Sequence, residues 1–360
     1  MANSPAERFV FGLGGPELSI AERAFFTAHP PLGFLLFKRN LQSPSQVVEL
    51  LEALRGIAPA AGAAGAPPLL FVDQEGGTVD RIGPLLGAKF ASAAACSEAG
   101  TDRVHENAYL MGRAARLLGF DVDFAPCLDL GQPGAGAVVL EGRCFGFHAE
   151  DVVIGGMVFL HGLARAGLAT CVKHFPGLGR GAVDSHAKLP VVDAHDVDLM
   201  VTDVAPFAKL ARGADGVMVG HAAYPGFEDG AIVPASCSPR IHAILRGPVR
   251  FDGVVYSDDL EMSALEGTLP ERAARAAEAG CDVLILSKTF EAYEEAVARV
   301  KALGADPARD ARLTALRRRV AGAPRPRFTE EAWTKLGEEA RAFADLMSKP
   351  REKRKDPFAF

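Results

Sequence analysis

Short apolar runs, separated by amphipathic segments, constrain the fold more than any other feature of this 360-residue chain. Each run is brief and nearly free of polar residues, as expected of parallel strands that are covered on both faces. Strands that alternate with helices in this way predict βαβ units and a parallel sheet. The sequence contains eight such runs, at Phe9–Leu13, Gly33–Phe37, Leu69–Asp73, Val122–Ala125, Ala169–Lys173, Gly216–Val219, Gly253–Tyr256 and Val283–Leu286.

The segments between these runs have the apolar spacing of amphipathic helices. Clear examples are Ser43–Arg55, His105–Leu118, Val197–Arg212 and Glu271–Ala279. Eight strand–helix units close into a barrel of roughly 250 residues, and insertions lengthen it. We therefore expect a (β/α)8 TIM-type barrel, with an open, doubly wound sheet as the alternative architecture.

The pattern changes after the eighth run, where only helices follow. They are expected at Phe290–Leu303, Arg309–Val320 and Glu330–Met347. The Ala-, Gly- and Pro-rich stretch 58–68 is interpreted as a loop, because the next strand continues the same series. The sequence thus predicts one domain over residues 1–347, with a C-terminal helical extension, and a charged tail over residues 348–360.

Composition excludes several classes of protein. Hydrophobic residues make up 49% of the chain and charged residues 23%, which is typical of a globular protein and excludes disorder over most of the length. A net charge of −6 and a pI of 5.9 give no overall attraction to nucleic acid.

Signals for export or membrane insertion are missing. The first residues lack a basic flank followed by a long apolar core, and no segment approaches the roughly 20 apolar residues that span a bilayer. The 6 cysteines are scattered without a CxxC pair, as expected of reduced, mostly buried thiols. We expect a cytoplasmic protein with no membrane or nucleic-acid partner.

Ionisable residues concentrate where the predicted strands end. The carboxyl ends of the strands and the loops after them carry the functional side chains of β/α barrels. This concentration therefore predicts that function lies at that rim. The residues are Asp73, Glu75 and Arg81 after the third strand, Asp129 and Arg143 after the fourth, Lys173, His174, Asp184 and His186 after the fifth, His221 after the sixth, and Asp258 and Asp259 after the seventh.

Some of these residues have a structural interpretation. Asp129 is expected to be an anchor under the barrel mouth. His221 is either functional or a buried histidine whose two nitrogens are both hydrogen-bonded. One of Asp258 and Asp259 could cap the helix that follows, so only one of them needs to be catalytic.

Three kinds of chemistry are compatible with the set. A metal-dependent hydrolase could use His174, His221 and Asp258, but the His-x-His pair expected on the first strand is absent. A Schiff-base aldolase would need a strand-end lysine, for which Lys173 or Lys288 could serve.

A retaining glycosidase needs a carboxylate nucleophile and a separate proton donor. Asp258 would supply the first, and a His186–Asp184 pair could supply the second. Only this class also accounts for the surrounding Asp, Arg and Lys side chains, which suit hydrogen bonding to sugar hydroxyls.

The stretch from Lys173 to His186, KHFPGLGRGAVDSH, resembles the signature of glycoside hydrolase family 3 in its single-domain bacterial β-N-acetylhexosaminidase branch. The resemblance extends from about Phe9 to Lys288. Further motifs stand in the family's order, at Leu36–Asn40, Asp73–Gly77, Phe124–Pro126, Gly142–Gly146 and Ser257–Met262.

The resemblance implies a retaining exo-β-N-acetylglucosaminidase that needs no metal or organic cofactor and recycles peptidoglycan fragments. It implies that Asp258 is the nucleophile and that His186, oriented by Asp184, is the acid/base. The residues expected to hold the N-acetylglucosamine ring are Asp73, Arg81, Arg143, Lys173 and His174. A β-glucosidase, a phosphorolytic enzyme and a non-catalytic sugar-binding barrel remain alternatives.

The chemistry agrees with these roles. Lys173 or His174 near Asp258 would keep that carboxyl ionised. An imidazole with an ordinary pKa of about 6.5 can donate and then remove a proton near neutral pH, and an adjacent carboxylate fixes its tautomer. Glycines at 177, 179 and 181 would let the loop move His186 over the sugar.

The sequence departs from the family pattern at Leu178, where a histidine is usual, at Arg180-Gly181, where Asp-Thr is usual, and at Thr78, where arginine is usual. None of these is the implied nucleophile or acid/base. We expect altered loop dynamics and an altered leaving-group subsite rather than lost chemistry. The expected partner is a small carbohydrate or muropeptide, bound by a monomer or weak homo-oligomer.

Overall fold

The eight strands of the protein form a closed parallel barrel in which each strand pairs with the next and β8 pairs with β1. This computed structural model describes residues 5–57, 66–132, 140–181, 188–288 and 290–349. The predicted (β/α)8 barrel is confirmed, and the open sheet is wrong. Residues 350–360 lie outside the described residues, so the boundary of the tail at 348 stays a prediction.

All eight strands lie where the apolar runs predicted them. Two are longer than expected at their carboxyl ends, because β5 and β7 include the polar residues that follow each run. The strands are β1 Phe9–Phe11, β2 Gly33–Leu36, β3 Leu69–Val72, β4 Val122–Asp123, β5 Ala169–Phe175, β6 Gly216–Val219, β7 Val254–Asp259 and β8 Val283–Leu286.

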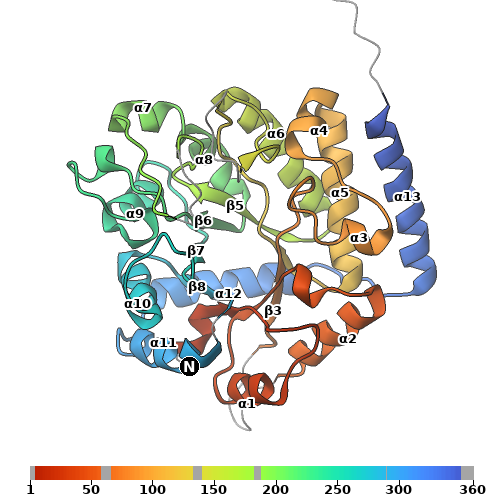
Figure 1. The fold of residues 1–360 in the computed structure, drawn as a ribbon, viewed down its shortest axis with the longest axis horizontal. Helices are drawn as coiled ribbons and strands as arrows, with labels where there is room; N and C mark the ends of the chain where they lie inside the picture. Colours follow the sequence, from red (N-terminus) through yellow and green to blue (C-terminus); the bar gives the residue numbers. More distant parts are fainter. Residues whose placement is uncertain (1–4, 58–65, 133–139, 182–187, 289, 350–360) are drawn as a thin grey trace, which may run out of the picture.

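Helices connect the strands and cover the outside of the barrel (Figure 1). Among the described helices, none has the length and apolar character needed to cross a lipid bilayer. The helices are α1 Ile20–Ala28, α2 Pro44–Arg55, α3 Gly83–Leu86, α4 Ala93–Ala99, α5 Thr101–Leu118, α6 Ala149–Arg165, α7 Asp196–Val201, α8 Ala205–Leu210, α9 Pro239–Arg246, α10 Leu269–Ala279, α11 Tyr293–Lys301, α12 Pro307–Ala321 and α13 Glu330–Ser348.

One helix predicted from the sequence is divided into two helices in the structure. The segment Val197–Arg212 is divided into α7 and α8, with the break at Thr202–Val204. Pro206 lies in the first turn of α8. Proline lacks the backbone N–H that a continuous helix would use, and its ring clashes with the preceding turn, so the helix stops and restarts.

Alternate residues of the strands fill the barrel interior. Phe71 of β3, Cys171 of β5 and Tyr256 of β7 belong to one buried cluster, whereas their neighbours Val72, Val172 and Val255 pack outward against the helices. Successive side chains of a strand point to opposite faces, so this division fixes which residues face inward.

Helix α12 closes the amino-terminal end of the barrel. Its residues Leu313, Leu316 and Val320 are buried in the same cluster as the inward-facing strand residues. Figure 1 shows α12 running across the barrel, while α13 lies along the outside next to α5. The predicted helical extension is therefore part of the barrel's packing rather than a separate unit.

An aspartate stands directly before each of β4, β6 and β8, at the end that α12 covers. Asp121, Asp215 and Asp282 each accept a hydrogen bond from a backbone N–H of the preceding strand, from Leu70, Thr170 and Val255 respectively. Arginines of α12 and the residues after it pair with these carboxylates: Arg325 with Asp121, Arg319 with Asp215 and Arg312 with Asp282.

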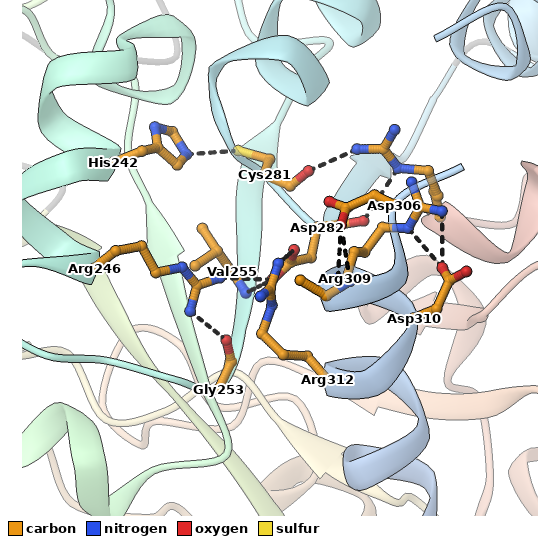
Figure 2. Close-up of polar contacts among 12 residues, drawn as sticks. His242, Arg246, Gly253, Val255, Cys281, Asp282, Asp306, Arg309, Asp310 and Arg312 are labelled. Atoms are coloured by element: carbon orange, nitrogen blue, oxygen red, sulfur yellow. Dashed lines mark hydrogen bonds and ion pairs between the residues drawn. The ribbon is translucent and has the colours of Figure 1, made fainter. Parts of the chain in front are cut away.

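Asp282 is buried and pairs with two arginines. Its carboxylate accepts from Arg246 at 2.9 Å and from two nitrogens of Arg312 at 2.9 and 2.6 Å (Figure 2). The side chain is only 2% exposed. Because a buried carboxylate is tolerated only when it is paired and hydrogen-bonded, Asp282 ties α9 and α12 to the sheet.

Substitution of Asp282 by alanine should lower the free energy of unfolding by about 3 kcal/mol, because it leaves two partly buried guanidinium groups unpaired. Arg240→Ala is the matched control, since the Arg240–Asp229 pair is exposed on both sides and should change stability by less than about 0.5 kcal/mol. Urea unfolding measures both values. Equal effects of the two substitutions would contradict the structural role of Asp282.

Candidate functional site

Charged side chains continue the inward-facing series at the open end of the barrel. Asp73 lies two residues beyond Phe71, Lys173 two beyond Cys171 and Asp258 two beyond Tyr256. They come from alternate strands, as the residues of one layer of a β/α barrel do. The sequence-predicted clustering of ionisable groups at this rim is therefore confirmed for these strands.

Both β5 and β7 carry a β-bulge where their polar residues stand. Val172 and Phe175 of β5 pair with Val217 and Val219 of β6, so β5 has one residue more than its partner across this interval. Tyr256 and Asp259 of β7 likewise pair with Val283 and Ile285 of β8. Bulges re-aim side chains and are common next to active sites. The pattern of apolar residues predicted neither bulge.

Asp258 lies in the β7 bulge and is half-buried. Its Oδ1 accepts a hydrogen bond from the N–H of Asp259 at 2.8 Å. Burial alone would raise the pKa of Asp258, but the His174 imidazolium, that N–H and the Lys173 ammonium hold the pKa below its usual value. The carboxylate is therefore ionised near neutral pH.

Lys173 and Arg143 share the carboxylate of Glu75. Glu75 accepts from Lys173 Nζ at 2.7 Å and from Nε and a terminal nitrogen of Arg143, both at 2.8 Å. Lys173 also contacts Asp73 Oδ1 at 2.8 Å. Residues from three different strand ends are thus joined in one network, in which Arg143 is held by a two-point contact.

The charges of this network stabilise one another. Burial would raise the pKa of Glu75, but Arg143 and Lys173 hold it well below its usual value. Burial would lower the pKa of Lys173, but Asp73 and Glu75 raise it. Burial raises the pKa of the neighbouring Asp123 well above its usual value. Two cations, Lys173 and Arg143, therefore face two anions, Asp73 and Glu75.

Glu75 was among the ionisable residues predicted at the rim, but it was not among those expected to hold the sugar or to take part in the chemistry. It stands in the motif that supplied Asp73, but a motif does not reveal which way a loop side chain turns. The sequence did contain a signal for this pairing. Two basic residues, Lys173 and Arg143, were predicted at one rim, and buried cations need an acidic partner nearby.

His174 is paired with Asp129. The His174 Nδ1 lies 2.6 Å from Asp129 Oδ2, and Asp129 Oδ1 accepts from the N–H of Leu178 at 2.7 Å. Burial alone would lower the pKa of His174, but the Asp129 carboxylate has the larger, opposite effect and raises the pKa to about 10. His174 is therefore an imidazolium, and the expectation that Asp129 is a structural anchor agrees with these contacts.

Cys127, Asp129 and His174 offer three potential metal-ligand atoms within 4.8 Å of one another. The Cys127 thiol donates to Asp129 at 3.1 Å, and the imidazolium occupies the same oxygen. Hydrogen bonding accounts for this group, so we assign no metal to it.

His221 and Asp259 have local partners. His221 Nδ1 lies 2.8 Å from Ser236 Oγ, and Nε2 lies 2.9 Å from the carbonyl oxygen of Asp259. The interpretation of His221 as a buried histidine with both nitrogens hydrogen-bonded is confirmed. The Asp259 side chain accepts from Ser287 Oγ at 2.5 Å and from the N–H of Glu261 at 3.1 Å, which caps the turn after β7.

The described part of the loop after β5 is held in place by close packing and by an ion pair. Gly177 has φ 132°, and a Cβ on Gly179 would lie 2.0 Å from the carbonyl oxygen of Leu130, so packing requires both glycines. Arg180, a departure from the family pattern, pairs with Asp203 at 2.8 Å. Residues 182–187 lie outside the described residues, and with them Asp184 and His186.

Arg81 lies in the turn after β3, where its backbone N–H donates to Gln74 at 2.9 Å. Its Nε is buried and has no hydrogen-bond partner within the described ranges. An unpaired buried donor of this kind remains available for a ligand.

A cavity of about 720 Å³ borders the site on the side of α4, α5 and α6. Gly142 and Cys144, on either side of Arg143, line it, together with Leu140, Phe145 and Ile154. It contains none of Asp73, Lys173 or Asp258. The cavity therefore adjoins the charged network without including it.

Comparisons with known proteins identify relatives over most of the chain. The model of the glycosyl hydrolase family 3 N terminal domain matches residues 20–322. A beta-hexosaminidase of Methylococcus capsulatus is 35% identical over 314 residues, covering 85% of this chain and 90% of the relative. One from Xanthomonas oryzae pv. oryzae is 38% identical over 291 residues, covering 77% and 82%.

Solved structures agree. A family 3 β-N-acetylglucosaminidase from a Paenibacillus species has a TM-score of 0.80 and 33% identity, covering 94% of this chain and 68% of its own. NagZ from Neisseria gonorrhoeae has a TM-score of 0.79 over 97% of this chain and 100% of its own, and at 24% identity it supports the fold alone.

Replacement of His174 by glutamine should remove a pH-dependent part of the stability. A group whose pKa is raised on folding, here from 6.5 to about 10, stabilises fully below the lower value and loses its effect as pH rises through the higher one. The difference in free energy of unfolding between wild type and His174→Gln should therefore be largest near pH 6 and fall to a pH-independent remainder at about pH 10. A pH-independent difference would contradict the imidazolium.

Proposed function

The chain belongs to glycosyl hydrolase family 3 and is a glycoside hydrolase, and we propose that it is a retaining exo-β-N-acetylglucosaminidase. The substrate would carry a terminal β-linked N-acetylglucosamine. The family match and the names of the curated beta-hexosaminidases support this specificity.

The observation that carries the proposal is the environment of Asp258. It is an ionised carboxylate at the barrel mouth, half-buried and surrounded by Lys173, His174 and His221. In the proposed reaction Asp258 attacks the anomeric carbon while the bond to the leaving oxygen breaks, which gives a covalent glycosyl-enzyme. Water then attacks the same carbon and releases Asp258.

The network around Glu75 would hold the sugar. Asp73 and the unpaired Nε of Arg81 offer an acceptor and a donor for sugar hydroxyls. Lys173, His174 and Arg143 are held in place by the ion pairs described above, and fixed donors of this kind bind without losing rotamer freedom. These assignments follow the resemblance residue by residue.

The acid/base would be His186, oriented by Asp184. His186 would donate a proton to the leaving oxygen and then remove one from the attacking water, as microscopic reversibility requires. Both residues lie outside the described residues. The assignment is supported by the loop motif from Lys173 to His186.

Peptidoglycan-derived muropeptides are the substrates that this branch of the family implies. The cavity next to Arg143 is large enough for a further sugar or a short peptide, and we assign the leaving group to that side.

Comparing aryl N-acetyl-β-glucosaminide with the aryl β-glucoside tests the acetamido specificity directly. Preference for the glucoside would overturn it.

Asp258→Asn should lower kcat on an aryl N-acetyl-β-glucosaminide by about 10⁴-fold or more, because the amide cannot act as a nucleophile. Asp259→Asn is the matched control on the adjacent residue. It should retain far more activity, since Asp259 turns toward Ser287 and Glu261. Steady-state kinetics measures both, and an active Asp258→Asn enzyme would refute the assignment.

His186→Ala should lower kcat/KM about 10²- to 10⁴-fold for a disaccharide, whose leaving group needs protonation. It should change kcat/KM little for a 2,4-dinitrophenyl glycoside, whose leaving group departs unprotonated. Equal losses on both substrates would mean that His186 is not the acid.

A further inference from the structure

We propose that His221 is a positioning residue that holds the bulge of β7 and thereby aims the carboxylate of Asp258 at the anomeric carbon. The inference rests on the proposed role of Asp258 as the nucleophile. It assigns a function to a histidine that neither the family resemblance nor the charged network uses.

The residue after Asp258 is held at both of its backbone polar groups. Its N–H donates to Asp258 Oδ1 at 2.8 Å, so the orientation of the carboxylate follows the orientation of this peptide. The carbonyl of Asp259 accepts from His221 Nε2 at 2.9 Å and from the N–H of Met262 at 3.0 Å. Of these donors, only His221 comes from another strand end, that of β6.

The hydrogen bonds define the tautomer of His221. A carbonyl can only accept, so Nε2 carries the proton, and Nδ1 accepts from the hydroxyl of Ser236 at 2.8 Å. Ser236 is itself fixed, because its N–H donates to the carbonyl of Gly220 at 3.0 Å. Burial lowers the pKa of His221, which agrees with a neutral ring.

A bulge needs such support, because one strand has a residue for which the partner strand has no counterpart. The side chain of Ser257 supplies a second support, since its hydroxyl accepts from the N–H of Ile285 at 3.1 Å. The side chain of Ser257, before Asp258, therefore bonds to the backbone of β8, and the side chain of His221 bonds to the backbone of Asp259, after Asp258. Without His221, the carbonyl of Asp259 would accept only from Met262 in its own turn, and the peptide would keep one contact to a neighbouring strand, from the N–H of Leu260 to the carbonyl of Ile285 at 3.0 Å.

Aiming the nucleophile affects the reaction in a recognisable way. A displacement of about 1 Å of a reacting group can cost about 10²-fold in rate. The loss should be the same for every leaving group, because the nucleophile acts on the anomeric carbon whatever departs. Loss of the acid/base, in contrast, depends on the leaving group.

The experiment compares His221→Ala and His221→Gln with wild type on the disaccharide and the 2,4-dinitrophenyl glycoside. His242→Ala is the matched control. His242 is another buried histidine with both nitrogens in contact, Nδ1 with Ser238 O at 2.9 Å and Nε2 with Cys281 Sγ at 3.3 Å, and it lies near Asp282 at the far end of the barrel (Figure 2). Loss of stability should be similar for the two alanine variants.

We expect His221→Ala to lower kcat/KM about 10²-fold equally on both substrates, with the affinity for N-acetylglucosamine unchanged. His221→Gln, whose amide can donate to the same carbonyl, should recover part of the rate, and His242→Ala should keep the wild-type rate. If His221→Ala does not fold, Ser236→Ala serves instead, with a smaller loss that is again equal on both substrates.

Unchanged kcat/KM in His221→Ala, a loss confined to the disaccharide, or an equal loss in His242→Ala would overturn the positioning role. These outcomes are separate from failure of the proposed function. That failure would appear as wild-type enzyme that turns over neither substrate.

Discussion

Pairing of buried charges is the constraint on which both ends of this barrel depend. At the amino-terminal end, arginines pair with the aspartates that precede β4, β6 and β8, and α12 is fixed across the opening. At the carboxyl end, Asp73, Glu75 and Asp129 neutralise Lys173, Arg143 and His174. The two ends differ in one respect. Within the described part of the chain, Asp258 makes a single side-chain hydrogen bond, so its carboxylate remains available for chemistry.

The strand ends combine this pairing with irregular backbone. The bulges of β5 and β7 fall at Lys173–His174 and at Asp258, and in each case a side chain from a neighbouring strand end bonds to the backbone there. Asp129 accepts from the N–H of His174 at 3.3 Å, and His221 donates to the carbonyl of Asp259. A regular ladder fixes side-chain direction by alternation alone, whereas a bulge needs added contacts to do so.

Much of this architecture could be predicted from the sequence. Apolar runs located every strand, because a parallel strand covered on both faces must be apolar, and Asp73, Lys173 and Asp258 followed from the polar residue that ends each run. The bulges could not be predicted, since one extra residue does not change composition. The pairing of Glu75 with Lys173 and Arg143 was missed because it depends on the path of a loop. The break before α8 was missed because helical periodicity masked the effect of Pro206. The roles of Asp184 and His186 stay predictions.

The central claim is that Asp258 forms a bond to the sugar. Incubating the wild-type enzyme with a slowly hydrolysed N-acetylglucosaminide, quenching with acid and mapping the peptides by mass spectrometry tests it most directly. The account predicts one N-acetylglucosaminyl adduct, on the peptide that contains Asp258. An adduct on any other carboxylate, or inverted stereochemistry in the first product released, would contradict it.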